Sequence, residues 1–155
     1  MKKKSTMQSA VCILLILLTL SFIWGNSLLP AKDSSALSGE LFRWLKVNLG
    51  EYLRGTEYLL RKLAHFSEFA GLGMVLTWFF HLMSQKGIHS FTMPLLFGSM
   101  TALLDETFQR FSPGRDPNVI DVWIDTAGVA TGSLLLLLIF FLWQKRKHQS
   151  SNGGK

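Results

Sequence analysis

The sequence has a single cysteine among its 155 residues, Cys12, so no intramolecular disulfide can support the fold. It also lacks a nucleophile motif, a glycine loop of the kind that cradles phosphate, and the paired cysteines of a zinc site. No basic helix with interleaved aromatic residues stands outside the apolar runs, although the net charge is +6. The sequence therefore predicts no nucleic-acid partner.

The long hydrophobic runs also lack the amphipathic stripe that helices of a soluble globular protein of this size would show, because they are apolar on all sides. Hydrophobic residues make up 48% of the chain, and the mean hydropathy is +0.28. Four apolar runs approach the about 20 residues that cross a bilayer, and they cover residues 9–29, 63–83, 91–111 and 119–143. We therefore predict an all-α polytopic membrane protein with four transmembrane helices.

The segments around these runs have separate predicted roles. Residues 1–8 are basic, and residues 144–155 are basic and then rich in Ser, Asn and Gly, which favours a disordered tail. Residues 9–143 form the membrane domain. Between the first two runs, apolar residues from Leu37 to Tyr52 recur at helical spacing, so we expect a short amphipathic helix in the membrane interface.

The first run has an alternative interpretation as a secretory signal peptide, since three lysines precede it. Two observations favour a retained helix instead. No convincing small-x-small cleavage site follows the run, and residues 9–29 are numerous enough to span.

Charge divides unevenly when the four predicted helices are threaded up and down. One side of the membrane then has all ten acidic residues and eight of the sixteen basic ones, a net charge of −2. The other side has eight basic residues and no acid, a net charge of +8. The count of Lys and Arg alone is a tie. Because no acid offsets the basic clusters at residues 2–4 and 145–147, we expect both termini in the cytoplasm.

The same threading brings polar side chains from three helices to the opposite, outer side, each within about two turns of a helix end. They are Lys62, His65, Glu68, Asp105, Glu106, Gln109, Arg115, Asp121 and Asp125. Burying carboxylates in a membrane-length helix is energetically costly. Five carboxylates in this group have only two permanently charged cations near them, Lys62 and Arg115, so we expect a polar binding pocket. The alternative is that these charges pair with one another and only hold helix ends together.

Individual roles follow from side-chain chemistry. Arg115 is the candidate for an anionic contact, because its planar guanidinium pairs with phosphate or carboxylate in two hydrogen bonds. His65 and the carboxylates suit a divalent cation, yet their spacing fits no metal motif, so we predict no metal ligands and leave the cofactor open. Gly128 and Gly132 share the face of Asp125 and predict close helix packing. Ser112, Pro113 and Gly114 predict a tight turn.

This pattern resembles the VanZ-like family of bacterial membrane proteins. The resemblance rests on Lys62-x-x-His65, Asp105-Glu106-x-x-Gln109, Pro113-Gly114-Arg115, and Asp121 followed by Asp125, Gly128 and Gly132. It implies a multi-pass fold in the bacterial cell membrane and an association with low-level resistance to the glycopeptide teicoplanin. The family usually has Asn at the position of Asp125, so a role that needs an amide donor there is not expected.

Three functional hypotheses remain open. The preferred one is a cell-envelope protein that binds or modifies an amphiphilic or lipid-linked ligand at an outer-leaflet pocket. The second is a membrane-embedded enzyme acting on a lipid phosphate or glycolipid, with His65 or a carboxylate as general acid or base and a possible need for divalent metal. The third is a structural partner of another membrane protein, docking through Gly128 and Gly132. The ligand and the oligomeric state cannot be predicted.

Overall fold

The computed structural model describes residues 2–29, 56–83 and 87–152. Four α-helices make up most of these segments: α1 (Lys2–Leu28), α3 (Thr56–Leu82), α4 (His89–Gln109) and α5 (Val119–Asn152). Within these ranges there is no strand, so the predicted all-α class is confirmed. The amphipathic helix expected between Leu37 and Tyr52 lies outside the described residues.

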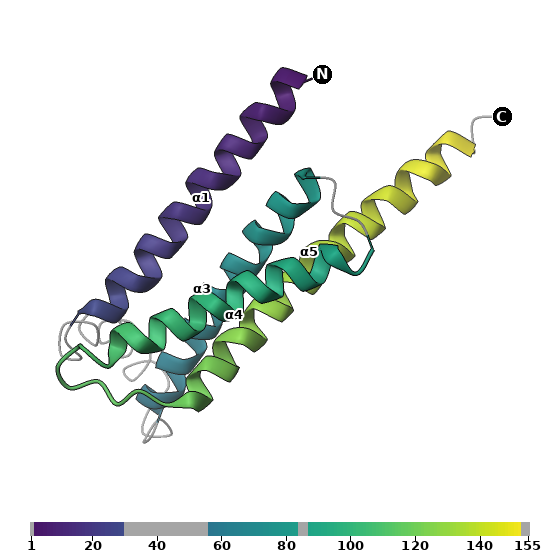
Figure 1. Ribbon diagram of the computed structural model, residues 1–155. Helices are drawn as coiled ribbons and strands as arrows, with labels where there is room; N and C mark the ends of the chain where they lie inside the picture. Colours follow the sequence, from purple (N-terminus) through teal and green to yellow (C-terminus); the bar gives the residue numbers. More distant parts are fainter. Residues whose placement is uncertain (1, 30–55, 84–86, 153–155) are drawn as a thin grey trace, which may run out of the picture.

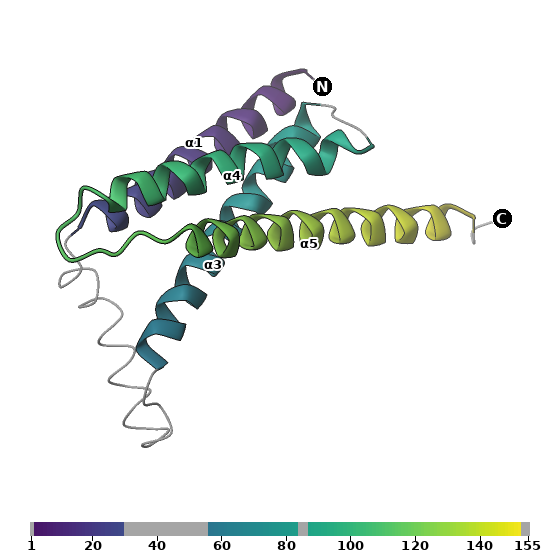
Figure 2. The ribbon, with the colours of Figure 1, turned by 60° about the horizontal axis from the view of Figure 1, so that its bottom comes forward.

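The helices alternate in direction, as Figure 1 shows. The end of α1, the start of α3, the end of α4 and the start of α5 lie together at the lower left of that view, and the chain termini lie toward the other end. Helix α3 packs against α5 and crosses it obliquely (Figure 2). The helix ends that hold the predicted polar residues are therefore neighbours.

Three helices are long and apolar enough to cross a membrane, over Thr6–Leu28, Arg61–Leu82 and Val119–Lys147. Helix α4, predicted as a fourth span, has 21 residues and is not one of these three. Five large apolar side chains of α4 are nevertheless exposed, namely Leu96, Phe97, Met100, Leu103 and Leu104. Its buried side includes Thr101, Asp105, Glu106 and Gln109. This reversal of the usual polar exterior suits a lipid surround with a polar interior.

Helix α5 continues as far as Asn152, so residues 144–152 are helical rather than disordered as predicted. Lengthening an existing helix needs no new nucleation, and Gln, Lys and Arg are good helix formers. The ammonium of Lys147 also lies 5.4 Å from the ring centroid of Trp143, one turn earlier. Composition alone indicates disorder for this tail, because it takes no account of the helix that precedes it.

Glycines set the distance between α3 and α5. A Cβ added at Gly128 would lie 2.5 Å from the carbonyl oxygen of Phe66, and one added at Gly132 would overlap the carbonyl oxygen of Ala70. Deeper along the same contact, Oγ of Ser133 donates a hydrogen bond of 3.3 Å to the carbonyl oxygen of Gly73. The backbones of α3 and α5 are thus in direct contact, which small residues make possible.

Candidate functional site

Two side-chain pairs face each other across the α3–α5 contact, near the ends of these helices. Lys62 and His65 are three residues apart on α3, and Asp121 and Asp125 are four apart on α5, so each pair lies on one helical face. Lys62 forms an ion pair with Asp121. One turn deeper, His65 lies beside Asp125, and the glycine contact follows.

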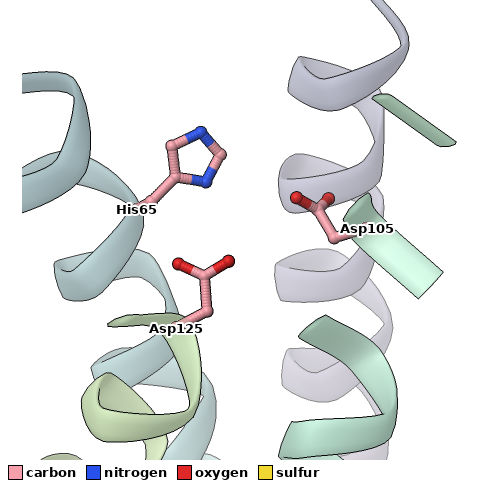
Figure 3. A group of neighbouring side chains, drawn as sticks. All are labelled: His65, Asp105 and Asp125. Carbon is pink, nitrogen blue, oxygen red and sulfur yellow. The ribbon is translucent and has the colours of Figure 1, made fainter. Parts of the chain in front are cut away.

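A third carboxylate approaches from α4. The metal-ligating atoms of His65, Asp105 and Asp125 all lie within 4.8 Å of one another, although the residues come from three helices. Figure 3 shows the three side chains facing a common space. Asp105 is fully buried, and Asp125 is 1% exposed. These two carboxylates are therefore shielded from solvent and close to each other.

Hydrogen bonding leaves this cluster only partly satisfied. Nε2 of Gln109 donates to Oδ2 of Asp105 at 2.9 Å, one turn along α4. Among the described residues, Oδ1 of Asp105, Oδ1 of Asp125 and Nδ1 of His65 have no hydrogen-bond partner. Buried polar atoms are nearly always paired, so this group needs an explanation.

A pocket of about 260 Å³ opens beside the cluster. Its lining includes five of the nine predicted site residues, Lys62, His65, Gln109, Asp121 and Asp125. The sequence did not predict the other lining residues, which are Arg61, Gly114, Asp116, Asn118 and Ile124. Arg61 directly precedes Lys62, and Asp116 and Asn118 belong to the loop that joins the two predicted polar helix ends. Their position in this loop was the sequence feature from which they could have been predicted.

Arg115 is not among the lining residues, because its loop turns it toward α1. The backbone N–H of Arg115 donates to the carbonyl oxygen of Ser112 at 3.2 Å, and Gly114 has a φ of 75°, as in a type II turn with Pro113 before it. Nη2 of Arg115 then donates to the carbonyl oxygen of Asn26 at 2.7 Å. Arg115 is 9% exposed and so lies largely inside the protein.

The same loop satisfies the C-terminal end of α1. The last four carbonyls of a helix have no partner within it. Arg115 binds that of Asn26, and Oγ of Ser112 donates to that of Ser27 at 2.8 Å. Burial lowers the pKa of the Arg115 guanidinium, with a further contribution from Arg61, but an arginine stays charged at neutral pH. A positive charge at a helix C-terminus is favourable.

Glu106 and Glu68 also lie apart from the pocket lining. Glu106 accepts a hydrogen bond from the backbone N–H of Asn118 through Oε1. Asn118 in turn caps α5, because its Oδ1 accepts from the backbone N–H of Ile120 at 3.0 Å. Glu68 is partly buried, and its Oε2 has no partner among the described residues. Glu106, on α4, therefore anchors the start of α5.

Comparison with known proteins tests the resemblance read from the motifs. Neither the curated proteins nor the solved structures gave a match. The VanZ/LLP1 family model matches residues 9–142, a range that includes every predicted site residue. The suspected VanZ-like resemblance is thus confirmed, and the chain belongs to the VanZ/LLP1 family.

Proposed function

We propose that this protein acts in the bacterial cell envelope by binding the polar head of an amphiphilic or lipid-linked molecule, and that binding gives low-level resistance to teicoplanin. The observation that supports this is a charged pocket of about 260 Å³ at one end of a helical bundle with an apolar exterior. When the polar head group of such a molecule occupies the pocket, its hydrocarbon chain can lie along the exposed apolar side chains of the bundle. Membership of the VanZ/LLP1 family supports the link to glycopeptide resistance.

The charges of the lining indicate what kind of head group would fit. Two cations, Arg61 and Lys62, face three carboxylates from Asp116, Asp121 and Asp125. A bare phosphate would meet more negative than positive charge there. A head group with an amine, or with both signs of charge, would complement this lining better.

Catalysis is the second candidate, and one observation favours it. His65 lies close to two buried carboxylates at the wall of the pocket, where an imidazole could transfer a proton to or from a bound ester. Such an enzyme would act on a lipid phosphate or glycolipid. Hydrolysis of a lipid phosphate or glycolipid by the purified protein would favour this candidate over binding alone.

We expect Asp121→Asn to remove most of the teicoplanin protection, because it keeps the shape of a pocket residue and removes its charge. Lys145→Gln is the matched control, since Lys145 is exposed near the far end of α5. Growth of a sensitive bacterium expressing each variant would be measured with teicoplanin present, together with membrane abundance. If Asp121→Asn lowers abundance as much as protection, the charge is structural. If the wild type gives no protection, the proposed function is wrong.

We further infer that the pocket opens at the outer face of the membrane and that both termini are cytoplasmic. The shared position of the polar helix ends, opposite the chain termini, supports this (Figure 1). In a Cys12→Ser background, Asp116→Cys should react with an impermeant thiol reagent in intact cells, since residue 116 is exposed. Gln149→Cys, exposed near the end of α5, should react only after permeabilisation. The reverse labelling pattern would invert this orientation.

A further inference from the structure

The cluster of His65, Asp105 and Asp125 has a property that head-group binding does not explain. Two of its members are buried carboxylates, and each has an Oδ1 without a hydrogen-bond partner in the described part of the chain. Both side chains point into the space that His65 also faces (Figure 3). Like charges so placed repel one another unless a proton or a cation lies between them.

We propose that His65, Asp105 and Asp125 bind a divalent transition-metal cation, Zn²⁺ or Mn²⁺. One imidazole nitrogen and two carboxylate oxygens make a mixed donor set, whereas Mg²⁺ and Ca²⁺ prefer oxygen atoms alone. The cation would supply the missing partner of all three unpaired atoms. It would also balance the two carboxylate charges with the imidazole neutral.

The geometry is close to that of a metal site. Bonds of about 2.0–2.2 Å in a tetrahedral site place ligand atoms about 3.4 Å apart. The donor atoms here lie within 4.8 Å of one another, so small side-chain rotations would close the site. Because His65 and Asp125 also line the pocket, a remaining coordination position is reachable from it.

The surroundings hold two of the ligands in place. Gln109 binds Oδ2 of Asp105, whereas Oδ1 has no hydrogen-bond partner among the described residues. Hydrogen bonds of this kind orient ligating side chains. Gly128 lies about one helical turn after Asp125 on α5. It allows the backbone contact with Phe66, the residue that follows His65. The glycine contact thus fixes the separation of α3 and α5 at the cluster.

The test uses the full-length protein purified in detergent without a polyhistidine tag and stripped by a chelator. Calorimetric titration with Zn²⁺, Mn²⁺, Mg²⁺ and Ca²⁺ should give one equivalent of Zn²⁺ or Mn²⁺. Asp105→Asn and Asp125→Asn should each weaken binding by more than about 100-fold, since losing only a hydrogen bond to a ligand costs about 10- to 100-fold. Asp116→Asn is the matched control, an exposed pocket acid outside the cluster, and should bind as the wild type does.

Two results would overturn the proposal. One is the absence of saturable Zn²⁺ or Mn²⁺ binding by the wild type. The other is binding by both cluster variants that equals binding by Asp116→Asn. Melting temperatures of the metal-free variants would show that each is folded. Because the metal alone is the probe, failure of the teicoplanin assay would not affect this result.

Discussion

Replacing Gly132 with leucine should prevent α3 and α5 from packing, and little folded protein should accumulate in the membrane. Even the Cβ atom would overlap the carbonyl oxygen of Ala70, which is backbone and cannot rotate away. Overpacking usually lowers the free energy of unfolding by about 1–3 kcal/mol, and we expect this substitution to reach or exceed the upper value. Membrane abundance and thermal unfolding in detergent would measure the effect.

The matched control is Gly71→Ala on α3. A Cβ at Gly71 meets no atom within 4 Å, so this change should be neutral or should stabilise the helix by about 0.5–1 kcal/mol. Comparing the two variants separates the effect of replacing a helical glycine from the effect of filling the contact between α3 and α5. Normal abundance and normal stability of Gly132→Leu would contradict the packing geometry.

Replacing Arg115 with alanine should lower the free energy of unfolding by about 1.5–3 kcal/mol, the usual contribution of a hydrogen bond to a charged group. The reason is that Arg115 satisfies a carbonyl at the end of α1 and is largely buried. Arg110→Ala is the matched control, because Arg110 lies in the same loop region and is exposed. Thermal unfolding of both variants in detergent, measured beside the wild type, would test this.

The Arg115 variant also separates two explanations of this residue. The sequence alone predicted an anionic contact, whereas the structure places the side chain against α1. Full stability combined with lost teicoplanin protection would support the anionic contact and contradict the structural role. Reduced stability with normal protection per folded molecule would support the structural role.

Several features follow from the sequence through local rules. Apolar runs of membrane length predict helices regardless of what they contact. Helical periodicity then places Lys62 with His65, and Asp121 with Asp125, on single faces. Up-and-down threading of successive helices then brings these faces to one end. Gly128 and Gly132 also make the close helix contact that was predicted for the face they share with Asp125.

Other features depend on how the elements meet in space. The turn at Gly114 was predictable, but the direction in which it sends Arg115 depends on where α1 ends. The convergence of His65, Asp105 and Asp125 likewise needs three helices at fixed rotations, with the α3–α5 separation set by backbone contact. Sequence spacing determines which side chains share a helix face. Only tertiary packing decides which faces meet and which buried atoms are left without a partner, since those contacts join residues far apart in the chain.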